Sequence, residues 1–250
     1  MGVLIPRSSF IETKNEHKAV KFHSPLSYFP NAITMNLEYE LQHFSLGEET
    51  RKEMLAGNTF APPEFEHIAK IVLAGHFLVS YKHGQAIVRP TCVEFYYHEE
   101  FEGGIKDPIV YHRNPKDQDK AKSIFPLGTL HNHVSGIDMT FEHGNNPQDA
   151  IRASMLIREF EINGKHDIRS TQLYESLYSQ TSIFNGFSIR WIDGEKEAEV
   201  EANYRKNVAE YDAKGSKKLS TLNPTALTTS NKKYIQDQRQ WQFRIKAQMK

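Results

Sequence analysis

A change of hydrophobic period in residues 68–97, IAKIVLAGHFLVSYKHGQAIVRPTCVEFYY, decides the fold. Residues up to 75 place apolar side chains at helical spacing. From Phe77 onward the side chains alternate between apolar and polar, as in a strand. The turn signal at 82–84, KHG, therefore predicts a hairpin of two strands, 77–81 and 85–97. Pro90 has no backbone N–H to donate, so the second strand should lie at an edge or carry a bulge there.

The remainder of the chain predicts an α+β fold: a curved, mostly antiparallel β-sheet of about seven strands with helices packed around it. We expect an N-terminal arm at 1–35, an α+β domain at 36–200 and a basic helical C-terminal extension at 201–250. The expected helices cover 36–56 with a break near Gly47, then 62–75, 171–179, 195–214 and 231–250. The expected strands beyond the hairpin cover 109–113, 128–134, 137–142, 153–160 and 184–192, and 215–230 is expected to be a loop.

Charge is balanced over the 250 residues, with 31 basic and 31 acidic side chains, but it is unevenly distributed. Residues 201–250 hold eleven Lys and Arg against four Asp and Glu, a net +7. Such a segment indicates a polyanionic partner, and a solvated helix is the alternative. Cys92 is the only cysteine, which excludes an internal disulfide and a cysteine-based zinc site. No apolar run approaches roughly 18 residues, so we expect no membrane partner and a cytoplasmic location, nucleoid-associated if the source is bacterial.

One pair of residues on the second hairpin strand is suited to chemistry. Strand geometry places Glu94 and Tyr96 on one face, where a carboxylate could act as a general base beside an aromatic stacking surface. An ordinary half-polar strand face is the alternative. The chain contains no Walker loop, no GxGxxG and no GxSxG motif.

A second candidate cluster lies at 130–133, LHNH. His131 and His133 share a strand face, a spacing found in metal sites, and the residues that could add ligands are His112, Asp138 and Glu142. Surface histidines are the alternative, because chance pairs are expected among 12 His.

Several segments, taken in chain order, form one colinear pattern. Residues 68–97 hold a helix that leads into a hairpin ending in Glu94-Phe95-Tyr96. The later segments are YHRN (111–114), PLGTLHNHVSGIDMTF (126–141), ASMLIREFE (153–161) and STQLYESLYS (170–179). In order and spacing this series, over roughly residues 64–192, resembles the alkyladenine (3-methyladenine) DNA glycosylase family.

The resemblance implies a site in which Glu94 activates a water that attacks the anomeric carbon of a flipped-out nucleotide. Tyr96 would stack on one face of the base, and His112 and His133 would cover the other face. Arg158 would support the site or contact a phosphate. Aromatic sandwiching of this kind offsets the cost of unstacking a base, about a few kcal/mol.

Two positions depart from the family pattern. Ser135 stands where the family inserts a bulky side chain into the duplex, and Glu142 stands near the family's base-screening Asn, so base specificity should differ. The predicted substrate-binding residues are Tyr96, His112, His131, His133, Ser135, Glu142 and Arg158. The predicted nucleic-acid-binding residues are Arg113, Lys217, Lys218, Lys232 and Lys233.

We therefore expect a monofunctional DNA glycosylase that removes a damaged or modified base, with an alkylated purine as the first candidate. The reaction needs one activated water, and we expect no metal and no cofactor. The expected partner is DNA, as a duplex or a single strand, and the expected state is a monomer. Two alternatives are a nucleic-acid-binding relative without catalysis, which Ser135 favours, and a metal-dependent hydrolase built on the His cluster.

Overall fold

The computed structural model describes residues 36–107, 123–133, 136–167, 184, 186–205, 209–211, 217–219, 225–229, 232–236 and 239–246. The expected arm at 1–35, strand at 109–113 and helix at 171–179 lie outside these residues, as do His112, Arg113 and Ser135. At His133 and in the strands between 209 and 236, the structure describes the backbone alone.

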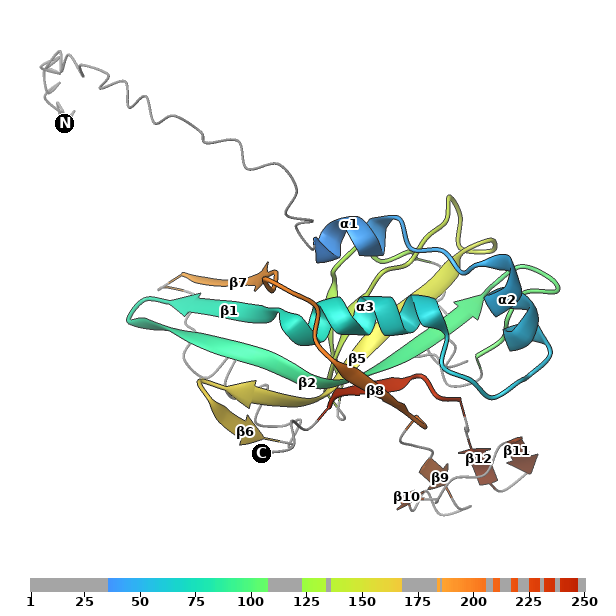
Figure 1. Cartoon of the computed structure of the whole chain (residues 1–250). Helices are drawn as coiled ribbons and strands as arrows, with labels where there is room; N and C mark the ends of the chain where they lie inside the picture. The colour runs from blue at the N-terminus through green and yellow to red at the C-terminus, as the bar shows by residue number, and fades with distance from the viewer. Residues whose placement is uncertain are drawn as a thin grey trace, which may run out of the picture. The chain divides into compact units, whose positions relative to one another are not determined.

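Three helices precede the sheet: α1 (Leu37–Gln42), α2 (Glu48–Leu55) and α3 (Pro63–Ala74). The break expected near Gly47 separates the first two. Pro63 begins α3, where its missing N–H is one that a first helical turn leaves unpaired in any case. The helix expected at 62–75 is thus confirmed, and it lies across β2 in Figure 1.

The main sheet has nine strands, and every pairing in it among the described residues is antiparallel. Its order is β3-β4-β5-β2-β1-β7, with β13 paired to both β2 and β8 and with β6 paired to β5. The α+β class is confirmed, with nine strands in this sheet rather than about seven. The bounds are β1 (His76–Tyr81), β2 (Gly84–Glu99), β3 (Leu130–His133), β4 (Gly136–Thr140), β5 (Ile151–Ile162), β6 (Lys165–Asp167), β7 (Phe187–Ile192), β8 (Val200–Asn203) and β13 (Gln242–Ile245).

Strand β2 is the longest and changes partner along one edge. Its first half pairs with β1, its second half pairs with β13, and β5 follows its other edge. The register with β5 shifts between Pro90 and Cys92 and again between Cys92 and Val93, which confirms a bulge beside the proline. This change of partner brings the C-terminal part of the chain against Glu94.

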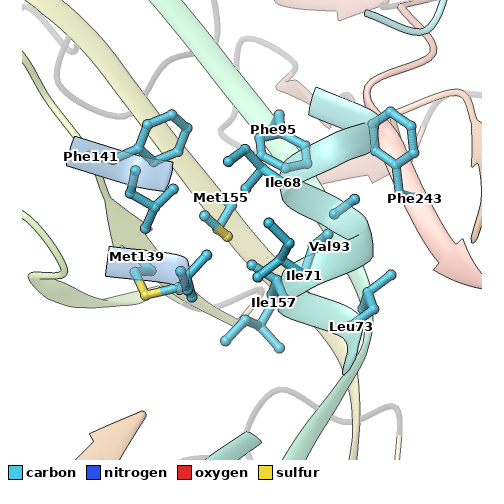
Figure 2. Packing of buried hydrophobic residues seen from close by; sticks show 14 of the residues in the cluster. Ile68, Ile71, Leu73, Val93, Phe95, Met139, Phe141, Met155, Ile157 and Phe243 are labelled. Atoms are coloured by element: carbon cyan, nitrogen blue, oxygen red, sulfur yellow. The ribbon is translucent and has the colours of Figure 1, made fainter. Parts of the chain in front are cut away.

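The hydrophobic core lies between α3 and one face of the sheet. Figure 2 shows Ile68, Ile71 and Leu73 of α3 beside the labelled side chains of the strands. The Phe65 ring stacks on Phe95 with centroids 4.7 Å apart. Each such buried side chain stabilises the fold by about 1.5–3 kcal/mol, so this face fixes the sheet on the helix. The buried strand residues of this face include Val93, Phe95, Ile137, Met139, Met155, Ile157 and Phe243, and Phe141, directly after β4, is buried with them.

The described residues of the C-terminal part form strands and no helix, which contradicts the helices expected at 195–214 and 231–250 and the loop expected at 215–230. Trp241, Phe243 and Ile245 recur at every second position, which is the strand period, and Trp241 and Phe243 are buried. Strands β8 and β13 join the main sheet. A second sheet has the order β10-β9-β12-β11, with bounds β9 (Ala209–Tyr211), β10 (Lys217–Leu219), β11 (Thr225–Thr229) and β12 (Lys232–Gln236).

Candidate functional site

The sheet face opposite the core carries a row of polar side chains. Residues directly opposite one another in an antiparallel sheet share a face. One such row, from β3 across to β8, contains His131, Asp138, Leu156, Glu94, Gln242 and Asn203. Four of the six are buried, and Glu94 has no exposed surface. Three polar members of the row, Asp138, Glu94 and Gln242, are therefore inside the protein, and Leu156 stands between Asp138 and Glu94.

The Glu94 carboxylate is held by donors from three strands. Arg158 donates to both of its oxygens, from Nε to Oε2 at 3.1 Å and from Nη2 to Oε1 at 2.7 Å. The Tyr96 hydroxyl donates to Oε1 at 2.5 Å, and the Gln242 amide donates to Oε2 at 3.2 Å. A two-pronged bond from a guanidinium is among the strongest hydrogen bonds that a carboxylate receives, and it fixes the orientation of the group. Glu94, Tyr96 and Arg158, three of the residues that the sequence analysis singled out, thus lie together in the structure.

Tyr96 joins this cluster through its hydroxyl group and keeps part of its surface exposed. Burial and then the charge of Glu94 raise the pKa of Tyr96 well above its usual value, so the phenol stays neutral and donates. Burial lowers the pKa of Arg158, but Tyr96 and Glu94 raise it by more, so its guanidinium stays charged. The cluster thus holds one fixed cation beside the carboxylate.

A further pair of charges anchors the C-terminal segment behind Tyr96. Arg205, which has no exposed surface, donates to Asp107 from Nη1 at 2.7 Å and from Nη2 at 3.1 Å. Its guanidinium lies 5.0 Å from the centre of the Tyr96 ring and 4.8 Å from that of Trp241. Burial lowers the pKa of Arg239, which lies 3.3 Å from Asp107, to about 10, so it also remains charged near neutral pH. Sequence reasoning missed this anchor, because Asp107 and Arg205 are far apart in the chain.

Asp138 is a second carboxyl of the row, and the sequence indicated it solely as a possible metal ligand. It is 5% exposed, and its Oδ1 has no hydrogen-bond partner within the described part of the chain. Burial raises the pKa of Asp138 to about 7; the charge of Glu94 adds to this effect and that of Arg158 opposes it.

Strand β4 approaches β5 closely because it begins at Gly136, where φ is +148° and a Cβ would lie 2.1 Å from the Ile157 carbonyl oxygen.

Glu142, predicted as a substrate-binding residue, lies in a different cluster from Glu94. Its Oε2 accepts from Arg152 Nη1 at 2.9 Å and from the backbone N–H of Phe125 at 2.8 Å. Arg152 stands opposite His98, four residues along β2 from Glu94. At about 3.3 Å per residue, this separates the two rows by about 13 Å. Burial raises the pKa of Glu142, and its nearest cation is Arg152.

For most of the other predicted site residues, the structure describes the position of the backbone alone. His131 stands opposite Asp138, and its ring centre lies 4.1 Å from that of Phe125. The backbone of His133 ends β3, opposite Gly136. Of the predicted nucleic-acid-binding residues, Lys217 and Lys218 lie in β10, and Lys232 and Lys233 lie in β12, all in the second sheet.

Within the described ranges, no group of three or more His, Cys, Asp or Glu side chains is arranged to hold a metal ion. No helix in that part of the chain is long and apolar enough to cross a membrane. The chain matches no protein-family model, no curated protein and no solved structure with significance.

Proposed function

We propose that the chain is a monofunctional DNA glycosylase, which hydrolyses the bond between a damaged or modified base and its deoxyribose. The observation that carries the proposal is the Glu94 carboxylate, buried and bound on both oxygens by Arg158, with the partly exposed Tyr96 beside it. The colinear resemblance described above supports the same assignment. A flipped-out base is the substrate that needs such a combination of carboxylate and aromatic surface.

In the proposed reaction, Glu94 takes a proton from a water as the water oxygen attacks the anomeric carbon. Arg158 keeps the Glu94 carboxylate in one orientation. The general base is therefore already in position at the moment of reaction, and no entropy cost is incurred in orienting it. Tyr96 offers its ring as a stacking surface for the base. The bond to the base breaks, and its electron pair leaves with the base.

A second candidate is a nucleic-acid-binding relative without catalysis. The observation in its favour is that both Glu94 oxygens already accept bonds from protein donors. A water would have to replace one of them, and Gln242, at 3.2 Å, is the weakest held. The two candidates make opposite predictions for base release, while both predict DNA binding.

The deciding experiment measures base release from duplexes that each contain one lesion, with the resulting abasic sites cleaved by alkali. The lesions are 7-methylguanine, hypoxanthine and uracil, and the proteins are wild type, Glu94→Gln and Glu159→Gln. Glu159 is the matched control, because it pairs with Arg244 at 2.7 Å on the same sheet but outside the Glu94 row. We expect wild type and Glu159→Gln to release at least one base, and Glu94→Gln to be slower by about 100-fold or more.

Two results would refute catalysis. One is wild type that binds the duplexes and releases no base, which would support the binding relative. The other is Glu94→Gln that is folded by thermal melting and retains the wild-type rate.

A further inference from the structure

One end of the main sheet has an open face. Strands β1 and β7 pair with each other, and the first half of β2 pairs with β1. In Figure 1 these three strands extend to one side beyond the end of α3. Val79 and Val88 point toward the core, so the side chains that alternate with them point away from it. We call the surface of these alternate side chains the hairpin face, and it includes Leu78, Gln85, Arg89, Ser188 and Arg190.

The hairpin face carries two arginines that no carboxylate neutralises. Arg89 and Arg190 are exposed, and neither forms an ion pair within the described part of the chain. Glu161 of β5 stands directly opposite Arg89, but no ion pair joins the two side chains. Lys82, in the turn between β1 and β2, and Lys165, at the start of β6, are also exposed and have no ion pair among the described residues. This end of the sheet therefore presents a surplus of positive charge to solvent.

The polar side chains beside the arginines are hydrogen-bond donors. Ser80, Gln85 and Ser188 stand in one row across β1, β2 and β7, and the Gln85 amide donates to Ser80 Oγ at 3.2 Å. About half or more of the hydrogen bonds between proteins and DNA reach phosphate or sugar oxygens, and Arg, Lys, Ser and Gln side chains donate them. The hairpin face therefore combines the charge and the donors that a phosphate backbone requires.

The two arginines are too far apart to bind a single phosphate. Leu78 of β1 stands opposite Arg190 on one side and opposite Ile87 on the other, and Ile87 is two residues before Arg89. With strands about 4.8 Å apart and about 3.3 Å per residue, the Cα atoms of Arg89 and Arg190 are about 12 Å apart. Phosphates follow one another every 3.4 Å or so along the axis of each DNA strand. Each arginine therefore has a phosphate of its own within reach.

The hairpin face suits a duplex better than a single strand. Among the described residues it carries no Phe, Tyr or Trp, because Phe77, Tyr81 and Trp191 of these strands point toward the core. Proteins that hold single strands without sequence preference stack the bases on exposed aromatic side chains. A duplex keeps its bases stacked on one another and presents its phosphates outward. A face of cations and short donors, without an aromatic platform, matches that backbone.

We propose that the hairpin face binds the phosphate backbone of duplex DNA outside the site of the reaction proposed for Glu94, and this proposal rests on the DNA partner of that proposed function. Arg89 is five residues before Glu94 on β2, a distance of about 16 Å. At about 3.4 Å per base pair, this corresponds to about five base pairs of duplex. Arg89 and Arg190 each neutralise a phosphate of the flanking duplex, and the face reads no base sequence.

The test measures binding of the full chain to a fluorescein-labelled, undamaged duplex of about 20 base pairs by fluorescence anisotropy, from about 50 to 200 mM NaCl. Each neutralised phosphate contributes about 0.9 to the slope of log K against log salt concentration, so Arg89→Gln/Arg190→Gln should lower the slope by about 1.8. Across this fourfold range of salt, wild type should lose about 12-fold more affinity than the double variant.

A matched control removes the same charge from the opposite side of the sheet. Lys52 is an exposed residue of α2, and Lys196 is exposed in the segment whose Ala198 N–H donates to the Lys70 carbonyl of α3. Lys52→Gln/Lys196→Gln should keep the wild-type slope. Both double variants change exposed side chains alone, so each should melt within a few degrees of wild type.

The outcomes separate this proposal from the proposed function. An unchanged slope in Arg89→Gln/Arg190→Gln, or an equal drop in the control, would overturn the role of the hairpin face and leave the glycosylase proposal in place. Tighter binding of wild type to a single strand of the same length would also overturn it. So would equal competition by poly-L-glutamate and unlabelled duplex at equal charge, which would indicate an acidic protein as the partner. Wild type that binds no DNA would overturn both proposals.

Discussion

Replacing Asp138 by Asn should make the stability of the protein less dependent on pH. The pKa of Asp138 rises from 3.8 in the unfolded chain to about 7 in the folded protein, because the carboxyl is buried. The folded state therefore binds more protons than the unfolded state between these two pH values, and stability falls as the pH rises through them. A difference of about three pH units, at about 1.4 kcal/mol each, corresponds to about 4 kcal/mol at most.

Urea unfolding of wild type and Asp138→Asn, at a series of pH values from about 4 to 8, measures this effect. Near pH 4 the two proteins should be similar in stability, because a protonated Asp and an Asn are alike in size and polarity. The variant should gain on wild type as the pH rises, by up to about 4 kcal/mol, with no further gain above about pH 7. Glu159→Gln, which removes a less buried carboxyl, should differ from wild type by less than about 1 kcal/mol throughout. A constant difference between Asp138→Asn and wild type, or a growing advantage of wild type, would refute the reasoning.

Two further substitutions test the sheet around the site by urea unfolding near pH 7. Arg158→Met should cost about 3–5 kcal/mol, because it leaves a buried carboxylate without its cation. Arg244→Met should cost less than about 1 kcal/mol, because the side chains of Arg244 and its partner Glu159 are 33% and 16% exposed. Equal losses would contradict the assigned burial. Phe243→Ala should cost about 3–5 kcal/mol, because the ring has no exposed surface. Ile245→Ala, at a residue that is 39% exposed, should cost clearly less. A small loss of stability for Phe243→Ala would show that β13 does not close the core.

The parts of the fold that sequence predicts are those decided by neighbouring residues. Helix α3 and the hairpin β1–β2 follow from the spacing of apolar residues and from one turn, and Glu94 and Tyr96 share a face because strands alternate. Strand β6 has the same kind of local signal, since the Asn163-Gly164 turn has positive φ at both residues, and the prediction overlooked it.

The partners of Glu94 could not be predicted in the same way. Gln242 reaches it from a strand whose charged neighbourhood indicated a solvated helix, although its apolar residues alternate with period two. Asp138 reaches the row through two registers, β4 with β5 and β5 with β2. Such registers depend on side-chain packing between strands that are far apart in sequence, and no local pattern encodes them.

The pairing of β13 with β2 has a consequence for the order in which a newly made chain can fold. Gln242 lies 148 residues after Glu94, so ribosomes complete β2 well before they make the strand that covers its edge. In that interval the hairpin can form from local contacts, while part of β2 presents unpaired N–H and C=O groups and its glutamate lacks one of its donors. We therefore expect nascent chains that end before β13 to depend on chaperones, and the sheet to close once translation has passed Ile245.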